Sequence, residues 1–210
     1  MNFIFIDRRG WPGAVLFLIL AAIVALIWLP LTLFFLFLLA FQVFFFRDPR
    51  RSIPVGSSIV SPADGKIVEI CSKCEDRFLG GNALKIGIFL SLFDVHVNRA
   101  PMSGNVRYIE HVTGKFINAL KSSSVDANES HWMGLESGNR RVLVRQIAGT
   151  IARRIYCDAR LGQAVDRGQK FGVICYGSRV EIFLPEGFRA RVSVGEKVRA
   201  GESILGEFHP

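Results

Sequence analysis

Residues Gly13 to Phe46 contain no charged side chain, and this run limits what the chain can fold into more than any other feature. A single straight helix of that length would extend about 50 Å, whereas the hydrocarbon core of a bilayer is about 30 Å thick. Pro30 divides the run into two arms of roughly 16 residues each, because a proline inside a helix removes a hydrogen bond and kinks or breaks it. The sequence therefore predicts a helical hairpin in a membrane, either re-entrant or membrane-spanning.

Arginines lie on both sides of this run: Arg8, Arg9, Arg47, Arg50 and Arg51. Positive flanks prefer the cytoplasm, so both ends of the hairpin are expected on the cytoplasmic side of the cell membrane. A cleaved signal peptide is the competing interpretation, but the run is too long for one and no small-residue cleavage site precedes Arg47. We therefore expect residues 1–47 to be a permanent membrane anchor.

Residues 48–58 are polar and turn-forming, which predicts a linker to a domain formed by residues 59–210. Short apolar runs punctuated by Gly, Pro, Asn and Asp recur through this domain, with little helical periodicity. The runs are Ile59–Val60, Lys66–Ile70, Ala83–Leu90, Val106–Val112, Val142–Ile147, Ile151–Tyr156, Phe171–Cys175, Val180–Leu184 and Arg189–Val194. The expected fold class is therefore mainly β, and Lys115–Ser124 is the best candidate for a short helix.

Two segments in the last third of the chain resemble each other, each with paired glycines around a polar turn: Val165–Gly172 and Val194–Gly201. Both look like the hairpins of biotinyl and lipoyl carrier domains, which build flattened β-barrels, so a flattened β-barrel or sandwich is expected here. A carrier function does not follow, because no lysine stands in the Met-Lys or Asp-Lys setting that such domains present.

Net charge and cysteine spacing limit the partners that the chain can bind. The formal net charge of +8 indicates an acidic partner, and the long apolar run favours an anionic membrane surface over nucleic acid. Cys71 and Cys74 form one C-x-x-C pair, but Cys157 and Cys175 stand alone, so the second half of a zinc site is missing. We expect reduced, structural cysteines and no bound metal.

Gly177 and Ser178 interrupt two strand-like runs, Phe171–Tyr176 and Val180–Leu184, at a place that packing explains poorly. Glycine adopts backbone angles closed to other residues, and the serine hydroxyl would then reach back to the carbonyl carbon of Gly177. That is the geometry for an intramolecular acyl shift. A plain two-residue turn is the alternative that these residues alone leave open.

Two further polar residues have informative neighbours. His96 lies at the end of the apolar run Ile86–Phe93, where polar residues crowd a strand terminus, and Asp64 precedes Gly65 in a turn-like segment. Taken alone, His96 is typical of a hydrogen-bonded structural histidine, and Asp64 is typical of a turn aspartate.

Five motifs in order change that interpretation: Phe45–Pro49, Ser61–Gly65, Phe93–Pro101, Gly114–Phe116 and Tyr176–Val180. With them the chain resembles the short, prokaryotic type of phosphatidylserine decarboxylase, and the resemblance spans nearly the whole chain. Each motif is weak by itself, whereas five in the right order over 210 residues are specific.

The resemblance implies a zymogen that decarboxylates phosphatidylserine to phosphatidylethanolamine. In this family the serine matching Ser178 attacks the preceding carbonyl, the ester eliminates, and the new dehydroalanine hydrolyses to a pyruvoyl group with loss of ammonia. The cut falls between Gly177 and Ser178, which gives a large chain, residues 1–177, and a small chain, residues 178–210. The pyruvoyl ketone forms a Schiff base with the substrate amine and accepts the electrons released as carbon dioxide leaves, without a metal.

The resemblance also assigns roles to individual residues. His96, oriented by Asp64, is nominated as the base that activates Ser178. Longer members of the family carry a second histidine in this loop where this chain has Arg99, which leaves open whether His96 serves self-cleavage, decarboxylation or both. Arg99 is a candidate contact for the substrate phosphate or carboxylate, because it is permanently charged. The segment Asn128–Arg140 lacks the acidic-Asn-Glu-Arg string expected of the family and stays unassigned.

Two other functions remain open at this point. One is a pyruvoyl decarboxylase of a related serine lipid, such as one with ether-linked chains. The other is a non-catalytic, membrane-anchored β-barrel binding module that keeps the Gly177–Ser178 bond intact. For the enzyme, the expected partners are a phospholipid substrate and an anionic membrane, with the two cut chains held together; the oligomeric state, including a homo-oligomer, is left open.

Overall fold

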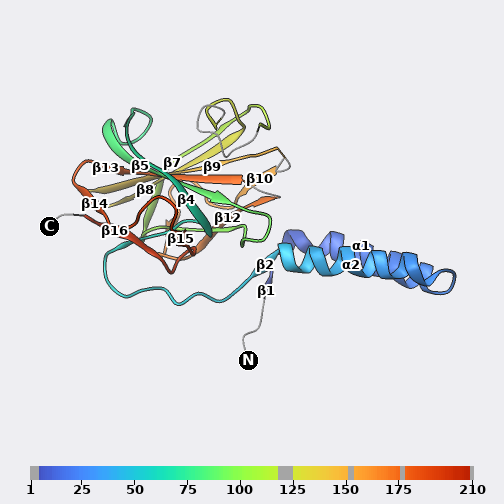
Figure 1. Cartoon of the computed structure of the whole chain (residues 1–210). Coiled ribbons are helices and arrows are strands. Elements are labelled where there is room, and N and C mark those ends of the chain that lie inside the picture. The colour runs from blue at the N-terminus through green and yellow to red at the C-terminus, as the bar shows by residue number, and fades with distance from the viewer. Residues whose placement is uncertain (1–4, 118–124, 151–153, 176–177, 209–210) are drawn as a thin grey trace. The chain divides into compact units, whose positions relative to one another are not determined.

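The computed structural model describes residues 5–117, 125–150, 154–175 and 178–208, and the chain divides into two compact units, Met1–Arg50 and Arg51–Pro210. The first unit is a helical hairpin in which α1 (Trp11–Ala25) and α2 (Leu29–Phe45) lie side by side (Figure 1). The short strands β1 (Phe5–Ile6) and β2 (Arg47–Asp48) pair antiparallel at its base, next to the 3-10 turn η1 (Arg8–Gly10).

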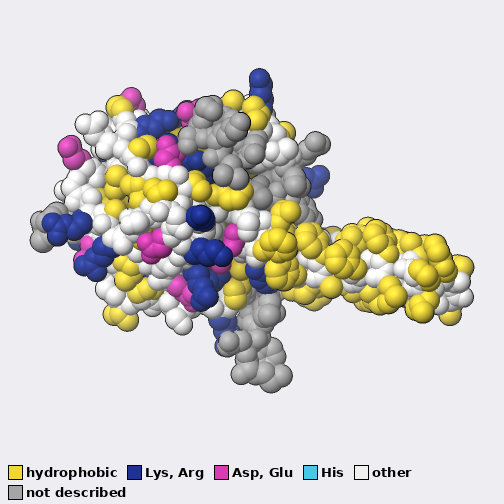
Figure 2. Space-filling model, in the orientation of Figure 1, with side chains coloured by type: hydrophobic (Ala, Val, Ile, Leu, Met, Phe, Trp, Pro, Cys, Tyr) yellow, Lys and Arg dark blue, Asp and Glu magenta, His cyan; other side chains and the backbone are white. Residues whose placement is uncertain are grey.

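Pro30 lies in the first turn of α2. A proline there loses no hydrogen bond, because the first N–H groups of a helix have no partner within it. Pro30 therefore begins the second arm, and the two apolar helices pack against each other as a hairpin. The segment Arg8–Ala25 is long and apolar enough to cross a membrane, while α2 is a shorter apolar helix. Hydrophobic side chains cover the visible face of both helices (Figure 2), as is typical of a surface that meets lipid.

The second unit consists of antiparallel strands, which form three sheets among the described residues. The largest has the strand order β11-β7-β8-β9-β13-β5-β4-β15, and two three-stranded sheets have the orders β10-β12-β6 and β14-β16-β3. The strands are β3 (Ile59–Val60), β4 (Gly65–Glu75), β5 (Gly81–Leu90), β6 (Val97–Arg99), β7 (Gly104–Val112), β8 (Ser130–Ser137), β9 (Arg140–Ile147), β10 (Arg154–Cys157), β11 (Ala164–Val165), β12 (Lys170–Cys175), β13 (Ser178–Pro185), β14 (Phe188–Ala190), β15 (Lys197–Val198) and β16 (Ile204–Phe208). The predicted mainly β fold class is confirmed.

The two faces of the eight-stranded sheet bury different kinds of side chain. Along β13, Val180 and Ile182 point into the main apolar core, whereas Arg179 and Glu181 point to the opposite face, where charged side chains are buried. Side chains alternate along a strand, so Ser178 shares the core face with Val180. Its partner on β5, Leu90, also belongs to that core.

Some elements differ from the predicted runs. β8 and β16 were not predicted, because Gly and polar residues interrupt their apolar residues and hide the pattern of a strand. β10 begins at Arg154, and residues 151–153 of the expected run lie outside the described residues. Residues 118–124 of the expected helix also lie outside them, while Lys115 forms a β-bridge with Asn128.

The two segments that look like carrier hairpins connect sheets instead of pairing with themselves. In Val165–Gly172 the chain leaves β11, which pairs with β7, and enters β12, which pairs with β10 and β6. In Val194–Gly201 the strand β15 pairs with β4, and the chain continues to β16 in another sheet. The carrier-like turns therefore join the sheets of the β unit.

Candidate active site

Ser178 is the first residue of β13, at a break between two strands. β12 ends at Cys175, and Gly177, on the other side of the expected cut, lies outside the described residues. The side chain of Ser178 is fully buried, and its Oγ has no hydrogen-bond partner among the residues that the structure describes. Burying a hydroxyl without a partner costs free energy. Packing alone therefore does not favour a serine at this position.

His96 lies in the loop between two strands that flank the Ser178 break. The loop Ser91–His96 runs from the end of β5, where Leu90 pairs with Ser178, to β6, which pairs with β12 just upstream of the break. The side chain of His96 is almost fully buried, and the Ile174 N–H donates to the His96 carbonyl at 3.3 Å. Both ends of the loop thus place His96 at the Ser178 end of the sheet.

A backbone carbonyl orients the ring of His96. Its Nδ1 is 2.9 Å from the carbonyl oxygen of Asp94, and a carbonyl can only accept, so Nδ1 carries the hydrogen of the neutral ring. Nε2 then keeps the lone pair that a general base needs. The loop is itself fixed, because the Asp94 carboxylate accepts hydrogen bonds from the N–H and the hydroxyl of Ser91 at 2.8 and 2.6 Å.

Asp64 contacts Arg51 and Ala200, and its described contacts include none with His96. Nη2 of Arg51 donates to the two carboxylate oxygens at 3.0 and 2.9 Å, and the Ala200 N–H donates to Oδ1 at 2.7 Å. Burial raises the pKa of the Asp64 carboxyl above its usual value, Arg51 and the Ala200 N–H oppose this, and the charge of Asp94 adds to it. Asp94 therefore links the two predicted residues, since its charge acts on Asp64 and its carbonyl holds His96.

Arg99 stands at the far end of β6 from His96. Its Nη1 donates to the Gly168 carbonyl at 3.0 Å, and its backbone N–H donates to the Pro62 carbonyl at 2.9 Å. These contacts tie the β6 segment to the turn before β12 and to the segment that carries Asp64. Arg99 therefore holds these segments together by hydrogen bonds, in addition to any contact with a substrate.

Directly after Ser178, the guanidinium of Arg179 lies in a buried network of ion pairs. It contacts Glu69 of β4, and its Nη2 is 2.9 Å from Oε1 of Glu181. Lys85 of β5 contacts the same two carboxylates, at 3.0 Å from Glu69 and 3.6 Å from Glu181. Arg179 and Glu181 are almost completely buried. The network therefore joins three adjacent strands on the face of the sheet behind Ser178.

Gly87 of β5 leaves the space that the Arg179 guanidinium occupies. A Cβ at Gly87 would lie 2.4 Å from Nη2 of Arg179, well inside the usual contact distance.

Burial alone would raise the pKa of Glu69, but hydrogen bonds and charges from Lys85 and Arg179 lower it to about 2. Glu69 is therefore ionised at neutral pH, and the ion pairs behind Ser178 persist there. Sequence reasoning missed this network, because its members are scattered along the chain.

The Gly114–Phe116 motif leads to the same end of the sheet. The Asn128 side chain accepts from the Ile117 N–H at 3.0 Å and donates to the carbonyls of Ile117 and Ala148 at 2.7 and 2.9 Å. Ala148 directly follows β9, whose last residue pairs with Arg179. Asn128 therefore fastens Ile117, which directly follows the motif, beside the Ser178 break.

The described residues contain no group of three or more His, Cys, Asp or Glu side chains that would hold a metal ion. The four cysteines, all in the described part of the chain, form no disulfide. His111 and His131 are cross-strand partners on β7 and β8, with ring centroids 6.1 Å apart. Burial and the neighbouring His111 lower the pKa of His131 to about 4, so His131 is neutral at pH 7.

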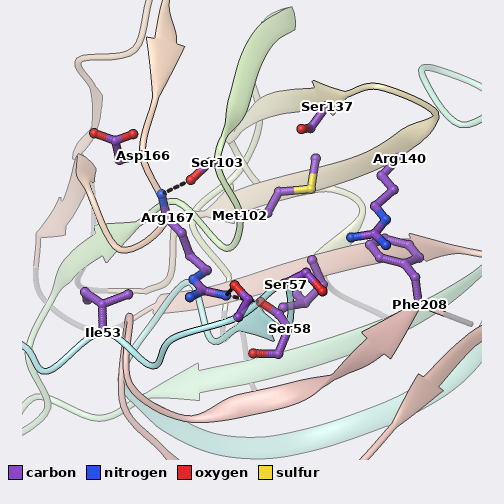
Figure 3. Close-up of a pocket in the computed structure, with 12 residues that line it drawn as sticks. Ile53, Ser57, Ser58, Met102, Ser103, Ser137, Arg140, Asp166, Arg167 and Phe208 are labelled. Atoms are coloured by element: carbon purple, nitrogen blue, oxygen red, sulfur yellow. Dashed lines mark hydrogen bonds between the residues drawn. The ribbon is translucent and has the colours of Figure 1, made fainter. Parts of the chain in front are cut away.

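A cavity of about 390 Å³ opens at the other end of β9 (Figure 3). Arg167 crosses it, where its backbone N–H donates to the Ser103 hydroxyl at 2.9 Å and its Nη1 donates to the Ser58 carbonyl at 3.0 Å. Arg140, which also lines the cavity, is the first residue of β9, whereas the last residue of that strand pairs with Arg179. The length of β9 separates its two ends by about 24 Å, so this cavity is distinct from the Ser178 site.

The comparisons with known proteins point to one family. The family model described as phosphatidylserine decarboxylase matches residues 38–206. The chain is similar to proteins named phosphatidylserine decarboxylase proenzyme. One from Symbiobacterium thermophilum is 42% identical over 203 residues, covering 96% of this chain and 94% of the relative. One from Burkholderia pseudomallei strain 1106a is 43% identical over 209 residues with the same coverage. One from Carboxydothermus hydrogenoformans is 44% identical over 203 residues, covering 95% and 94%.

Proposed function

The chain belongs to the phosphatidylserine decarboxylase family, and from this premise we propose that it cuts itself between Gly177 and Ser178 and then converts phosphatidylserine to phosphatidylethanolamine. One observation carries the proposal: Ser178 begins a central strand with a fully buried hydroxyl that has no hydrogen-bond partner in the described part of the chain. A buried hydroxyl of this kind is costly to keep. A role as internal nucleophile gives the Ser178 hydroxyl a function that packing does not.

In the first step, Oγ of Ser178 attacks the carbonyl carbon of Gly177 while Nε2 of His96 takes the hydroxyl proton. The amide between the two residues becomes an ester. Loss of the Ser178 α-proton then expels the carboxylate of Gly177, and water hydrolyses the resulting dehydroalanine to a pyruvoyl group and ammonia. The hydrogen bond from Nδ1 of His96 to the Asp94 carbonyl supports this role, because it puts the ring hydrogen on Nδ1 and the lone pair of a neutral ring on Nε2.

The surroundings of Ser178 fit a pyruvoyl group at the start of the small chain. β13 is paired on both sides, and Arg179 is fixed by Glu69 and Glu181 one residue from the new terminus. The pyruvoyl group supplies a ketone for the substrate amine and an electron sink for the bond that loses carbon dioxide. β13, β15 and β16 of the small chain each pair with a strand of the large chain. The two chains, residues 1–177 and 178–210, therefore stay together after the cut.

The other predicted residues receive supporting roles. The carboxylates of Asp64 and Asp94 stabilise the positive charge that His96 acquires when it takes a proton. Arg99 contacts the phosphate or carboxylate of the substrate, because its guanidinium is permanently charged. No role in the reaction requires a metal.

The apolar hairpin and the net charge of +8 support a location at an anionic membrane, with the β unit on the cytoplasmic side. A lipid substrate does not leave the bilayer readily, so an enzyme anchored there meets it at high local concentration. A homo-oligomer is compatible with this arrangement.

The proposal is tested by incubating the purified chain with mixed micelles that contain phosphatidylserine and measuring phosphatidylethanolamine by mass spectrometry. We expect product from the wild-type chain and none from Ser178→Ala. An ether-linked phosphatidylserine, supplied in parallel, tests the alternative of a related serine lipid through the ratio of the two kcat/KM values. Full activity in Ser178→Ala would remove the pyruvoyl mechanism.

A further inference from the structure

The turn between α1 and α2 exposes apolar side chains alone. Leu26, Ile27 and Leu29 are 93%, 80% and 68% exposed, and the segment from Ala25 to Pro30 contains no charged side chain. Turns that face water usually carry Gly, Asn, Asp or Ser. Trp28 alone would suit a membrane interface, but no polar or charged side chain accompanies it. This turn is therefore poorly suited to contact with water.

Several backbone polar groups of the same turn find partners within the hairpin. The N–H groups of Ile27 and Trp28 both donate to the Val24 carbonyl, at 2.9 and 3.0 Å. The Trp28 carbonyl accepts from the N–H and from the hydroxyl of Thr32, at 3.2 and 3.1 Å. Pro30 has no N–H to satisfy. Backbone groups that find partners internally are what a turn in hydrocarbon requires.

The polar side chains within the apolar run also turn inward. Thr32 and Gln42 are both buried. Nε2 of Gln42 donates to the Gly10 carbonyl at 3.3 Å, and it fits there because Gly13 has no Cβ, which would lie 2.5 Å from that nitrogen. The outer surface of the hairpin is thus left apolar from its base to its turn, which matches lipid on every side.

The hairpin is shorter than the hydrocarbon core is thick, and its base is positively charged. α1 has 15 residues and α2 has 17, which correspond to about 22 and 25 Å, while the hydrocarbon core is about 30 Å thick. At the base, β1 and β2 bring the two ends of the hairpin together, since Ile6 pairs with Arg47. Arg8 and Arg9 lie beside this pair in η1. Arginines at both ends of the hairpin place its base in the headgroup region. With helices of this length, the turn then stops short of the headgroups of the opposite leaflet.

We propose that the hairpin enters the bilayer from one face, passes the midplane, and turns back inside the hydrocarbon without crossing it. The occupant of its apolar surface is the acyl-chain interior of the membrane. Both basic ends then lie on the same face as the β unit. By length, Arg8–Ala25 would suffice for a crossing, but a crossing would push Leu26 and Ile27 toward water.

The proposal is tested by site-resolved thiol labelling of the full-length chain in membranes. Leu26→Cys places a thiol at the turn, and Cys74, an exposed native cysteine of the β unit, is the internal control. A membrane-impermeant maleimide is applied to intact cells, to inverted vesicles and to detergent-solubilised membranes, and the modified peptides are identified by mass spectrometry. Ile27→Cys provides a second probe, should Leu26→Cys fail to accumulate.

We expect Cys74 to be modified from one side of the membrane and the turn thiol to be modified only after detergent is added. Modification of the turn from the side opposite Cys74 would show that the hairpin crosses the bilayer and would overturn the proposal. Modification of both sites from the same side without detergent would show that the turn lies outside the hydrocarbon, which also overturns it. Neither result depends on decarboxylase activity.

Discussion

Replacement of Arg179 by methionine should destabilise the β unit strongly, because the guanidinium neutralises two carboxylates in a place with little water. Arg179 is fully buried and contacts Glu69 and Glu181. Removing one partner of a buried ion pair costs about 3–5 kcal/mol. Lys85 still contacts both carboxylates, Arg145 still contacts Glu181, and Glu69 is partly exposed, so we expect a loss of at most about 3 kcal/mol, the lower end of that range.

The free energy of unfolding is measured by urea titration of the full-length chain in detergent, followed through the circular dichroism of the sheets. The experiment is done in the Ser178→Ala background, because an uncut chain gives one cooperative transition to compare. Arg191→Met is the matched control. Arg191 pairs with Glu207 at 3.1 Å on the surface, where side chains are 58% and 45% exposed, so its loss should cost at most about 1 kcal/mol.

The pH dependence gives a second signature of the same network. The pKa of Glu69 is lowered to about 2 by Lys85 and Arg179 against the effect of burial. A carboxyl whose pKa is depressed in the folded state adds stability above its unfolded pKa and loses it as the pH falls toward the folded value. The difference in the free energy of unfolding between the chain with Arg179 and the Arg179→Met chain should therefore shrink as the pH falls from about 4.5 to about 2. Equal stability of Arg179→Met and Arg191→Met at pH 7 would refute the reasoning.

Three further outcomes are expected. His96→Ala should slow chain cleavage by about 10²- to 10⁴-fold, followed by gel electrophoresis over hours, with Asp64→Ala slowing it less; His111→Ala is the control, and normal cleavage in His96→Ala would remove His96 as the base. Arg99→Ala should leave cleavage intact and raise KM for phosphatidylserine, whereas an unchanged KM would exclude it from substrate binding. Deletion of residues 1–46 should release the chain from membranes after a high-salt wash without stopping self-cleavage, and a truncated chain that stays in the membrane fraction would contradict the anchor assignment.

Local sequence patterns predicted the parts of the fold that local physics determines. The uncharged run with Pro30 predicted the hairpin, since nothing outside the run is needed to make two apolar helices of that length. The apolar runs predicted most of the central strands, including β5, β9 and β13. β8 was missed, because its buried residues depend on sheet partners on both sides and not on a strict alternation of its own.

The site was predicted unevenly for a related reason. Ser178 stood out as a polar residue between apolar runs, and the family motifs supplied His96 and Asp64. No local pattern indicated that Arg51 would hold Asp64, or that Glu69 would lie against Arg179. Those contacts join residues far apart in the chain and arise from strand register, which a single sequence does not specify.

Self-cleavage at Ser178 is tested most directly by the intact mass of the purified protein. We predict two species, residues 1–177 and a small chain from residue 178 that is lighter than the same chain starting with serine by the mass of ammonia. Ser178→Ala should give one uncut chain. A wild-type protein that shows a single full-length mass with Ser178 intact would contradict the account.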